Sequence, residues 1–312
     1  MKIDIIIPNF NGSHLIKRNL PDVIKAVKNY QHVAITIVDD CSEEADKRHL
    51  REVIDTINFS SKIPVQLLEH EKNLGFSSTV NTGVTSSKAD VVVLLNSDVS
   101  PTIDFLDDAL IKIEQKDVFG VGCLEKSIER EGIVLRGSGR GMWARGFLLH
   151  QEGDVKSERT FWVSGGSAVF RRELYQKIGG MDRLYNPFYW EDIDFSYRAQ
   201  KSGYKIFFAN KSIVEHRHEE GAIKSNFKSE EIKRIAYRNQ FIFVWKNITD
   251  TSLIANHLFW LPIHLGSALI HGNTSFIVAF FVAISMLPDI IVERKKQKKL
   301  YKFSDKKILE SQ

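Results

Sequence analysis

The chain has 312 residues, of which 43% are hydrophobic and 26% charged, so it can bury a large core and is not disordered as a whole. Its formal net charge of +4 is too small to argue for a nucleic-acid partner, and no basic helix interleaved with aromatic residues occurs. The N-terminal apolar run ends at Pro8, unlike a signal peptide, and Cys41 and Cys123 lack a zinc-site spacing. We therefore expect a cytoplasmic protein with two buried free thiols.

The first 120 residues alternate between two apolar patterns. Four short apolar runs are typical of buried parallel strands: Ile3–Ile7, Val33–Val38, Val65–Leu68 and Val91–Leu95. Between the second and third runs, four apolar side chains fall on one helix face: Leu50, Val53, Ile54 and Ile57. Ser42 and the two glutamates after it are suited to cap that helix. Strands alternating with helices predict a doubly wound, mainly parallel α/β sheet, in which ligands bind at the carboxyl ends of the strands.

Polar and acidic residues follow each of the four strands. The segments are Pro8–Gly12, Asp39–Ser42, Glu69–Gly75 and Asn96–Asp98. Because the strands are predicted to be parallel, these segments should gather at one edge of the sheet. The Gly-x-Gly-x-x-Gly fingerprint is missing after the first strand, which disfavours a dinucleotide-dependent hydride transfer enzyme.

The pattern changes after about residue 120. Glycine and aromatic residues become more frequent, and we expect short strands in a mixed second half that covers the first. A helical pattern returns from Lys228 to Trp245, and the sequence then becomes strongly apolar.

The strand Val91–Leu95 runs directly into the acidic loop Asn96-Ser97-Asp98. A carboxylate at a strand end beside a phosphate site can hold Mg²⁺ or Mn²⁺, which commonly bridge one or two carboxylates and a substrate diphosphate. The alternative is a turn in which Asp98 caps a helix beginning near Pro101.

Glu191, Asp192 and Asp194 precede an amphipathic helix that contains Arg198. A carboxylate at a helix N-terminus keeps a low pKa and stays ionised, which suits a base that takes a proton from a sugar hydroxyl. The alternative is a solvated acidic helix start paired with Arg198.

His216 follows a short strand and could bind a metal ion through a ring nitrogen, although a lone histidine more often has a structural role. His216 and His218 are two residues apart on an extended segment, so at most one of them faces a given site. Between Asn73 and Gly83 a helix begins among small residues, where Gly75 permits close backbone approach and the helix amides suit a diphosphate. The alternative there is packing against the sheet.

Taken in order, these segments resemble the family 2 glycosyltransferases, which have the GT-A fold. The resemblance spans about residues 3–220 and rests on these pieces: Ile5–Gly12, Ile37–Ser42, Asn73–Phe76 with Asn81, Leu94–Asp98, Gly165–Arg171, Ile178–Asp182, Glu191–Asp194 with Arg198, and His216. The form Asn73-Leu-Gly-Phe is similar to rhamnosyltransferase-like members. The Gln-x-x-Arg-Trp motif of processive synthases is missing, which favours single addition.

The resemblance implies a role for each matching residue. Asp98 would bind a divalent metal, Mg²⁺ or Mn²⁺, with Asn96 in the first position of the family's Asp-x-Asp motif and His216 as a further ligand. Asp192 would be the catalytic base, supported by Glu191 and Asp194. The expected donor-binding residues are Pro8, Asn9, Asp39, Asn73, Gly75, Asn96 and Gly166. Asp39 would contact the uracil or thymine of a UDP- or dTDP-linked sugar. The family inverts the anomeric carbon, which fits a site with one base, one metal and no nucleophile.

The expected organisation follows. Residues 1–225 would form the catalytic domain, with a nucleotide-sugar half at 1–120 and an acceptor half at 121–225. Residues 226–250 would be a helical connector. The rival functions are a sugar-phosphate nucleotidyltransferase, which lacks its Gly-rich, Arg-containing loop here, and a non-catalytic nucleotide-sugar-binding scaffold.

Residues 251–312 carry two apolar runs and a basic tail. The runs at 253–271 and 276–292 are interrupted by Pro262 and Pro288, so they are marginal as membrane spans, and the cluster Arg294–Lys299 would meet anionic lipid. We expect peripheral or re-entrant attachment to the cytoplasmic face of a membrane, near a glycan or lipid-linked acceptor. The alternative is docking on the soluble domain or a dimer interface. If the apolar region attaches to a membrane, a cut near Asp250 would release a folded catalytic domain.

Overall fold

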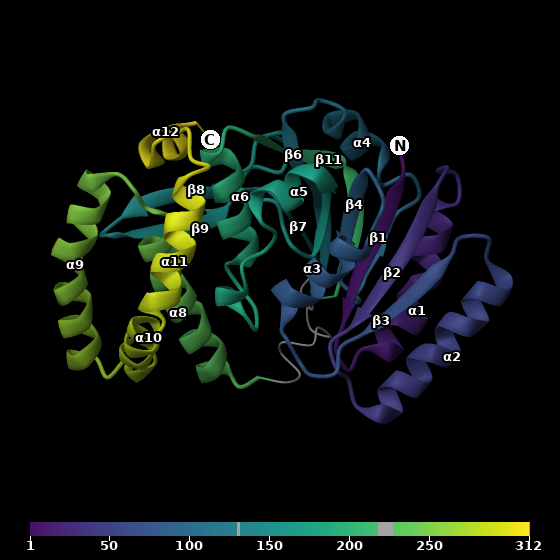
Figure 1. Cartoon of the computed structure of the whole chain (residues 1–312), viewed down its shortest axis with the longest axis horizontal. Coiled ribbons are helices and arrows are strands. Elements are labelled where there is room, and N and C mark those ends of the chain that lie inside the picture. The colour runs from purple at the N-terminus through teal and green to yellow at the C-terminus, as the bar shows by residue number, and fades with distance from the viewer. Residues whose placement is uncertain (130–131, 218–226, 312) are drawn as a thin grey trace.

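The computed structural model describes residues 1–129, 132–217 and 227–311 (Figure 1). One large sheet forms the centre, in the strand order β3-β2-β1-β4-β10-β6-β11-β5, with β7 beside β6. Its strands are β1 (Ile3–Asn9), β2 (Val33–Asp39), β3 (Val65–Glu69), β4 (Val91–Leu95), β5 (Val99–Pro101), β6 (Val118–Glu129), β7 (Gly132–Arg136), β10 (Ser167–Arg171) and β11 (Lys205–His216). The first four strands are parallel, with Ile5 opposite both Ile35 and Val93, which confirms the predicted parallel half.

The second half of the sheet differs from the prediction of short strands. β6 and β11 have 12 residues each, and they pair in parallel. β10 is antiparallel to both β4 and β6, so it joins the two halves into one mixed sheet. The glycine-rich composition obscured these strands. Gly120 of β6 lies under the Phe170 ring, where a side chain would not fit freely.

Helices cover both faces of the sheet, as a doubly wound arrangement requires. One face packs against α1 (Ser13–Val27), α2 (Glu44–Ser60) and α4 (Asp107–Ile113). The other packs against α3 (Phe76–Ser86), α5 (Arg172–Ile178) and α6 (Glu191–Lys201). The apolar stripe of α2 is buried through Leu50, Val53 and Ile54, as its spacing predicts.

Ser42 is not the cap of α2, contrary to the prediction. The helix begins one residue after Glu43, which makes no side-chain capping bond. The Ser42 hydroxyl instead donates to Asp39 Oδ1 at 2.5 Å and accepts from the Asn11 amide at 2.7 Å. Ser42 therefore shapes the loops at the carboxyl ends of β1 and β2.

The C-terminal part consists of α8 (Ser229–Asn247), α9 (Thr251–Ile270), α10 (Thr274–Ser285), α11 (Leu287–Lys298) and α12 (Asp305–Glu310). These helices share an apolar cluster with α6 and with a hairpin formed by β8 (Gly139–Ala144) and β9 (Phe147–Glu152). Pro262 lies inside α9 without ending it, whereas Pro288 lies at the start of α11, where the chain bends by 66° after α10. Figure 1 shows α9, α10 and α11 at the end of the molecule opposite β3 and α2.

The last helix, α12, is held against α6 by a buried ion pair. Asp305 accepts from Lys201 of α6 at 2.6 Å, and both side chains are fully buried. The same carboxylate accepts from the Tyr197 hydroxyl at 2.6 Å and from the Thr249 amide at 2.6 Å. A cut near Asp250 would leave Lys201 buried without its acid, so residues 251–312 are not the separable tail that the sequence indicated.

We expect Asp305→Ala to lower the free energy of unfolding by about 3–5 kcal/mol, because it leaves a buried ammonium group unpaired. Chemical denaturation of the full chain would measure the loss. Glu310→Ala, an exposed change on the same helix, should have little effect. Equal stability of the two variants would contradict this account of how α12 is attached.

Candidate active site

A cavity of about 350 Å³ opens at the carboxyl ends of the central strands. Ten of the twelve residues predicted for the site line it: Pro8, Asn9, Asn73, Gly75, Asn96, Asp98, Gly166, Glu191, Asp192 and His216. They come from the end of β1, from the loops after β3 and β4, from the loop before β10, from α6 and from β11. The prediction that one sheet edge collects them is therefore confirmed. Asp39 and Asp194 lie behind the cavity wall.

Sheet register brings His216 to Asp98. β11 pairs with β5 so that His216 lies opposite Val99, the residue after Asp98. His216 Nε2 is 3.1 Å from Asp98 Oδ2, and His216 Nδ1 is 3.1 Å from Glu125 Oε2. Burial alone would lower the pKa of His216, but hydrogen bonds to the two carboxylates outweigh it and raise the pKa to about 9. Glu125 was missed by sequence reasoning because it lies within β6, where nothing in its spacing marks it. The turn in which Asp98 caps a helix near Pro101 is also excluded, since Pro101 belongs to β5.

The donor set around Asp98 fits a hard divalent cation. Among the described residues, no three His, Cys, Asp or Glu side chains converge as a metal cluster. The buried Asn96 Oδ1, however, accepts no hydrogen bond there, and it lines the cavity with Asp98 and His216. An amide oxygen, a carboxylate and an imidazole are an incomplete ligand set of the kind that Mg²⁺ or Mn²⁺ completes with substrate phosphates.

Glu191 and Asp192 form an unequal acid pair. Burial and the neighbouring Asp192 charge raise the pKa of Glu191 well above its usual value, and its buried Oε2 accepts no hydrogen bond from the described residues. Burial also raises the pKa of Asp192, but amides of Ile193 and Gly165 donate to its carboxylate at 2.8 and 3.3 Å and limit the rise. The prediction of a low pKa for Asp192 is therefore wrong, because burial outweighs the helix terminus. Asp192 remains the more easily ionised of the two.

Asp194 points away from the cavity into the core. Arg198 Nε donates to it at 2.7 Å, and Lys246 of α8 lies 2.7 Å from its other oxygen. Burial on its own would raise the pKa of Asp194, but these two cations lower the pKa to about 2. Asp194 thus pairs with Arg198, as the alternative for this helix start supposed, but it is buried and not solvated, and it acts by fixing the first turn of α6.

The first amides of α3 are already bonded to protein groups, unlike the open phosphate cradle that the sequence indicated. Leu74 and Gly75 amides donate to the Asp40 carboxylate at 2.8 Å each, and the Ser77 amide donates to Asn186 Oδ1 at 3.2 Å. Gly75 has a φ of +81°, and a Cβ there would lie 2.7 Å from the Asn186 side chain. Gly75 is required for this close packing.

Asp39 connects the cavity wall at the end of β1 to the loop after β2. Its carboxylate accepts from Asn9 Nδ2 at 2.8 Å and from the Ser42 hydroxyl and amide, so it orients Asn9 in the cavity wall. Asp40, and not Asp39, contributes to the lining. A direct contact between Asp39 and a base stays a prediction.

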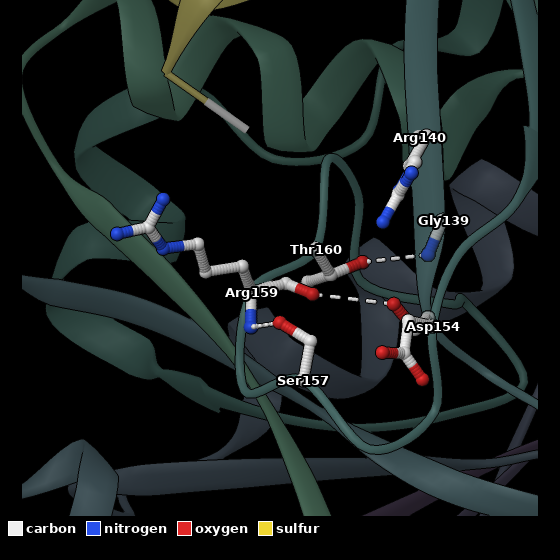
Figure 2. Close-up of a pocket in the computed structure, with 7 residues that line it drawn as sticks. Gly139, Arg140, Asp154, Ser157, Arg159 and Thr160 are labelled. Carbon is white, nitrogen blue, oxygen red and sulfur yellow. Dashed lines mark hydrogen bonds between the residues drawn. The ribbon is translucent and has the colours of Figure 1, made fainter.

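Figure 2 shows a second cavity of similar volume beside the β8–β9 hairpin, lined by residues that include Arg140, Asp154 and Arg159. The Thr160 hydroxyl accepts from the Gly139 amide, and the Ser157 hydroxyl accepts from the Arg159 amide. Both arginines are exposed, and no predicted site residue lies in this cavity. We therefore place the active site in the cavity at the strand ends.

Comparison with known families bears on whether this sheet belongs to a glycosyltransferase or to a sugar-phosphate nucleotidyltransferase. The family model "Glycosyl transferase family 2" matches residues 4–179, which is more than half of the chain. The chain belongs to glycosyl transferase family 2. Family membership disfavours the nucleotidyltransferase that shares the sheet plan.

Curated relatives of this glycosyltransferase are distant. An uncharacterized protein y4gI of Sinorhizobium fredii is 24% identical over 262 residues, covering 78% of this chain and 27% of the relative. The glycosyltransferase GlyA of Streptococcus pneumoniae is 23% identical over 242 residues, covering 71% of this chain and 31% of the relative. The chain thus spans about a third or less of these relatives.

Solved structures support the GT-A fold of the transferase. GalNAc-T7 with UDP, GalNAc and Mn²⁺ is similar with a TM-score of 0.62 at 19% identity, over 79% of this chain and 48% of that one. TarS 1–349 of S. aureus with UDP-GlcNAc has a TM-score of 0.60 at 17% identity, over 100% of this chain and 91% of that one. The rhamnosyltransferase-like subgroup stays a prediction.

The loop before the acid pair is held by a buried asparagine that sequence reasoning missed. Asn239 of α8 donates from Nδ2 to the carbonyls of Tyr185, Phe188 and Tyr189 at 3.1, 2.9 and 2.7 Å. Tyr189 and Trp190 both have left-handed backbone, with φ of 71° and 74°. Such strained residues need surrounding contacts to persist. The only sequence signal was a polar residue within the apolar pattern of the helix.

We expect Asn239→Ala to reduce turnover by the glycosyltransferase and to lower the free energy of unfolding by about 2–3 kcal/mol, because three carbonyl contacts are lost. Donor binding should change less than turnover, since Asn239 contacts the loop before the acid pair and not the loops at the ends of β1 and β2. Steady-state kinetics, nucleotide titration and denaturation would measure these effects. Arg234→Ala, an exposed change on the same helix, is the control. Unchanged turnover in Asn239→Ala would contradict the positioning role.

Proposed function

We propose that the protein transfers one sugar from a nucleotide diphosphate donor to an acceptor hydroxyl, with inversion at the anomeric carbon. One observation carries the proposal: Asp98 with His216 and Asp192 with Glu191 open into the same cavity at the strand ends. A cation-binding group and a proton acceptor are the two parts that a single displacement needs. Nothing in the proposal requires a covalent intermediate.

The donor diphosphate would lie beside Asn96, Asp98 and His216, which would hold Mg²⁺ or Mn²⁺. When bound, the cation supplies positive charge that stabilises the departing diphosphate. The nucleotide would lie toward Pro8, Asn9 and the Asp39 loop, and a UDP- or dTDP-linked donor is the proposed class. The UDP-GlcNAc in the similar TarS structure and the UDP and Mn²⁺ in GalNAc-T7 support this assignment.

Asp192 would act as the base. Its carboxylate accepts the proton of the acceptor hydroxyl while that oxygen forms the new bond to the anomeric carbon and the bond to the diphosphate breaks. Attack on the face opposite the leaving group inverts the centre. Glu191 keeps its proton to higher pH than Asp192, because its buried oxygen receives no amide donor, so the two acids do not compete for the role.

The acceptor side would be the aromatic wall next to the acid pair. Phe188 contacts the rings of Tyr189 and Phe227, and these three residues line the cavity together with the acid pair. Sugar rings present apolar faces that suit such walls. A cell-surface glycan or a lipid-linked sugar is the proposed acceptor. A non-catalytic scaffold is the rival, and it would have no use for two buried acids of unequal pKa.

Metal dependence is the first expected property. EDTA should abolish transfer and added Mn²⁺ or Mg²⁺ should restore it, because the donor set at Asp98 is incomplete without substrate and cation. Asp98→Ala should lose both turnover and the enhancement of UDP affinity by Mn²⁺, measured by calorimetric titration. Asp55→Ala, an exposed acid on α2, should keep both. Full activity in EDTA would contradict the assignment of a metal site at Asp98.

The second expected property concerns the base. Asp192→Asn keeps the size of the side chain but cannot take the proton, and it should reduce turnover by roughly 10²–10⁴-fold with donor affinity nearly unchanged. In the wild type, activity should be present above the raised pKa of the acid pair and lost as pH falls through it, at a pH above the usual aspartate range. A pH–rate profile would measure this. Normal turnover in Asp192→Asn with an inactive Glu191→Gln would move the base to Glu191.

A further inference from the structure

The outer surface of α9 and α10 is largely apolar and carries no formal charge. Of the 21 large apolar side chains that are exposed in the described chain, 11 lie between Leu258 and Val292. No Asp, Glu, Lys or Arg occurs from residue 251 to residue 288, although 26% of the whole chain is charged. A surface for a soluble partner carries a polar rim, whereas the exposed polar residues of this stretch, which include Ser252, Ser267 and His271, carry no formal charge.

Helix α9 has two different faces. His257, His264 and Ala268 lie on the side that packs against the β8–β9 hairpin and α8, and His257 and Ala268 are its only buried residues. The opposite side presents apolar side chains to the outside: Leu258, Phe259, Ile263, Leu269 and Ile270. α10 continues this surface with Val278, Phe281, Val282 and Ile284, while Phe276, Ala279 and Ala283 face inward. We call the outward side of α9 and α10 the apolar face.

By length and apolarity α9 alone, or with the bent pair α10 and α11, could cross a membrane. The hairpin argues for a different placement. Its tip carbonyls at Gly146 and Arg145 bond to His257 Nδ1 at 2.7 Å and to His264 Nε2 at 2.8 Å, in the middle of α9. A crossing helix would carry these polar groups and the Arg145 charge to the centre of the bilayer, where they are costly. A helix lying in the plane of the interface avoids that cost.

Positive charge gathers in the last turn of α11, after Glu293, which lies 3.5 Å from Lys296. Ile291 and Val292 are exposed, Lys295 follows Ile291 by four residues on the same helix face, and Lys299 follows the last residue of the helix. Lys296 and Lys298 are also exposed. An apolar surface bordered by lysines matches the order of acyl chains and anionic headgroups in a leaflet.

A cavity of about 470 Å³ lies between the hairpin, α8 and α9. Phe147, Leu149 and Phe276 give it an apolar lining, and Arg145 is the only formally charged residue in that lining. No carboxylate of the described chain pairs with Arg145, whose guanidinium lies 5.7 Å from the centre of the Trp260 ring. Arg145 has a φ of 48° in a two-residue turn, a place that asparagine or glycine usually takes. A strained arginine directed to a cavity beside an apolar face is suited to an anionic headgroup.

We propose that the apolar face lies in the interface of an anionic membrane and that the cavity at Arg145 receives the phosphate of a phospholipid headgroup. The lysines of α11 add attraction for the same leaflet. The proposal concerns where the protein is held and does not depend on the proposed reaction. Figure 1 shows that α9 and α10 form one end of the molecule, so such contact leaves the strand-end cavity open to substrates.

Vesicle flotation of the full chain tests the apolar face. The wild type should float with vesicles that contain phosphatidylglycerol in phosphatidylcholine and should float much less with phosphatidylcholine alone. The double variant Phe259→Ser with Phe281→Ser, at positions 65% and 63% exposed, should lower partitioning by at least about tenfold. The matched control, Phe59→Ser with Ile111→Ser, removes exposed apolar residues from α2 and α4 and should float normally.

Arg145→Gln tests the headgroup cavity. It should reduce binding to phosphatidylglycerol vesicles by roughly fivefold, the effect of one cation near such a surface, without changing binding to phosphatidylcholine. Arg140→Gln, at the other end of the same hairpin, is the control. Far-ultraviolet circular dichroism and the thermal midpoint of each variant would confirm folding.

Two outcomes would overturn the proposal. The first is a full chain that stays in the lipid-free fraction, including the case in which light scattering shows a dimer that the phenylalanine variant dissociates. The second is equal flotation of Arg145→Gln and Arg140→Gln, which would remove the headgroup cavity from the proposal. Because no measurement uses enzymatic turnover, failure here is distinguishable from failure of the proposed reaction.

Discussion

A buried charge cluster around Asp194 connects the parts of this molecule that must act together. Asp194 and Arg198 lie one turn apart on α6, and Lys246 reaches them from α8. Lys246 also pairs with Asp182, and Arg198 donates to the carbonyls of Ile178, the last residue of α5, and of Gly180 just after it. Removing one member would leave an uncompensated charge in the core, so the cluster enforces one arrangement of these segments.

The chemistry of the acid pair follows from this constraint. Because Asp194 is fixed toward the core, Glu191 and Asp192, which lie three and two residues earlier in the same helix turn, are directed to the cavity. Asp192 then meets the amides of Ile193 and Gly165, whereas Glu191 meets none at its buried oxygen. Two neighbouring acids in different surroundings acquire different proton affinities, which is how one of them can remain ionised as a base at neutral pH.

Much of this arrangement could be predicted from the sequence. The parallel strands and the polar loops after them have local signatures, namely short apolar runs followed by turn and acidic residues, and family resemblance supplied the order of the pieces. What could not be predicted depended on distant pairing. Glu125 reaches His216 only because β6 and β11 are neighbours, and β10 inserts antiparallel between β4 and β6 without a local signal. The pKa of Asp192 was misjudged for the same reason, since burial is a property of the assembled fold and not of a helix terminus.

The regions assigned to catalysis and to the tail are joined by contacts between residues that lie far apart in the sequence. The Nζ atom of Lys201 on α6 donates to Oδ1 of Asp305 at 2.6 Å, although the two residues lie 104 positions apart in the sequence. α8 lies between the two regions: Asn239 holds the loop before the acid pair, while Phe241 packs against Phe147 of the hairpin and Phe276 of α10. A helix that contacts both sides makes them one body. Any surface that orients α9 and α10 would therefore orient the strand-end cavity as well, so the position of the acceptor relative to a membrane would be set by rigid packing and not by a flexible linker.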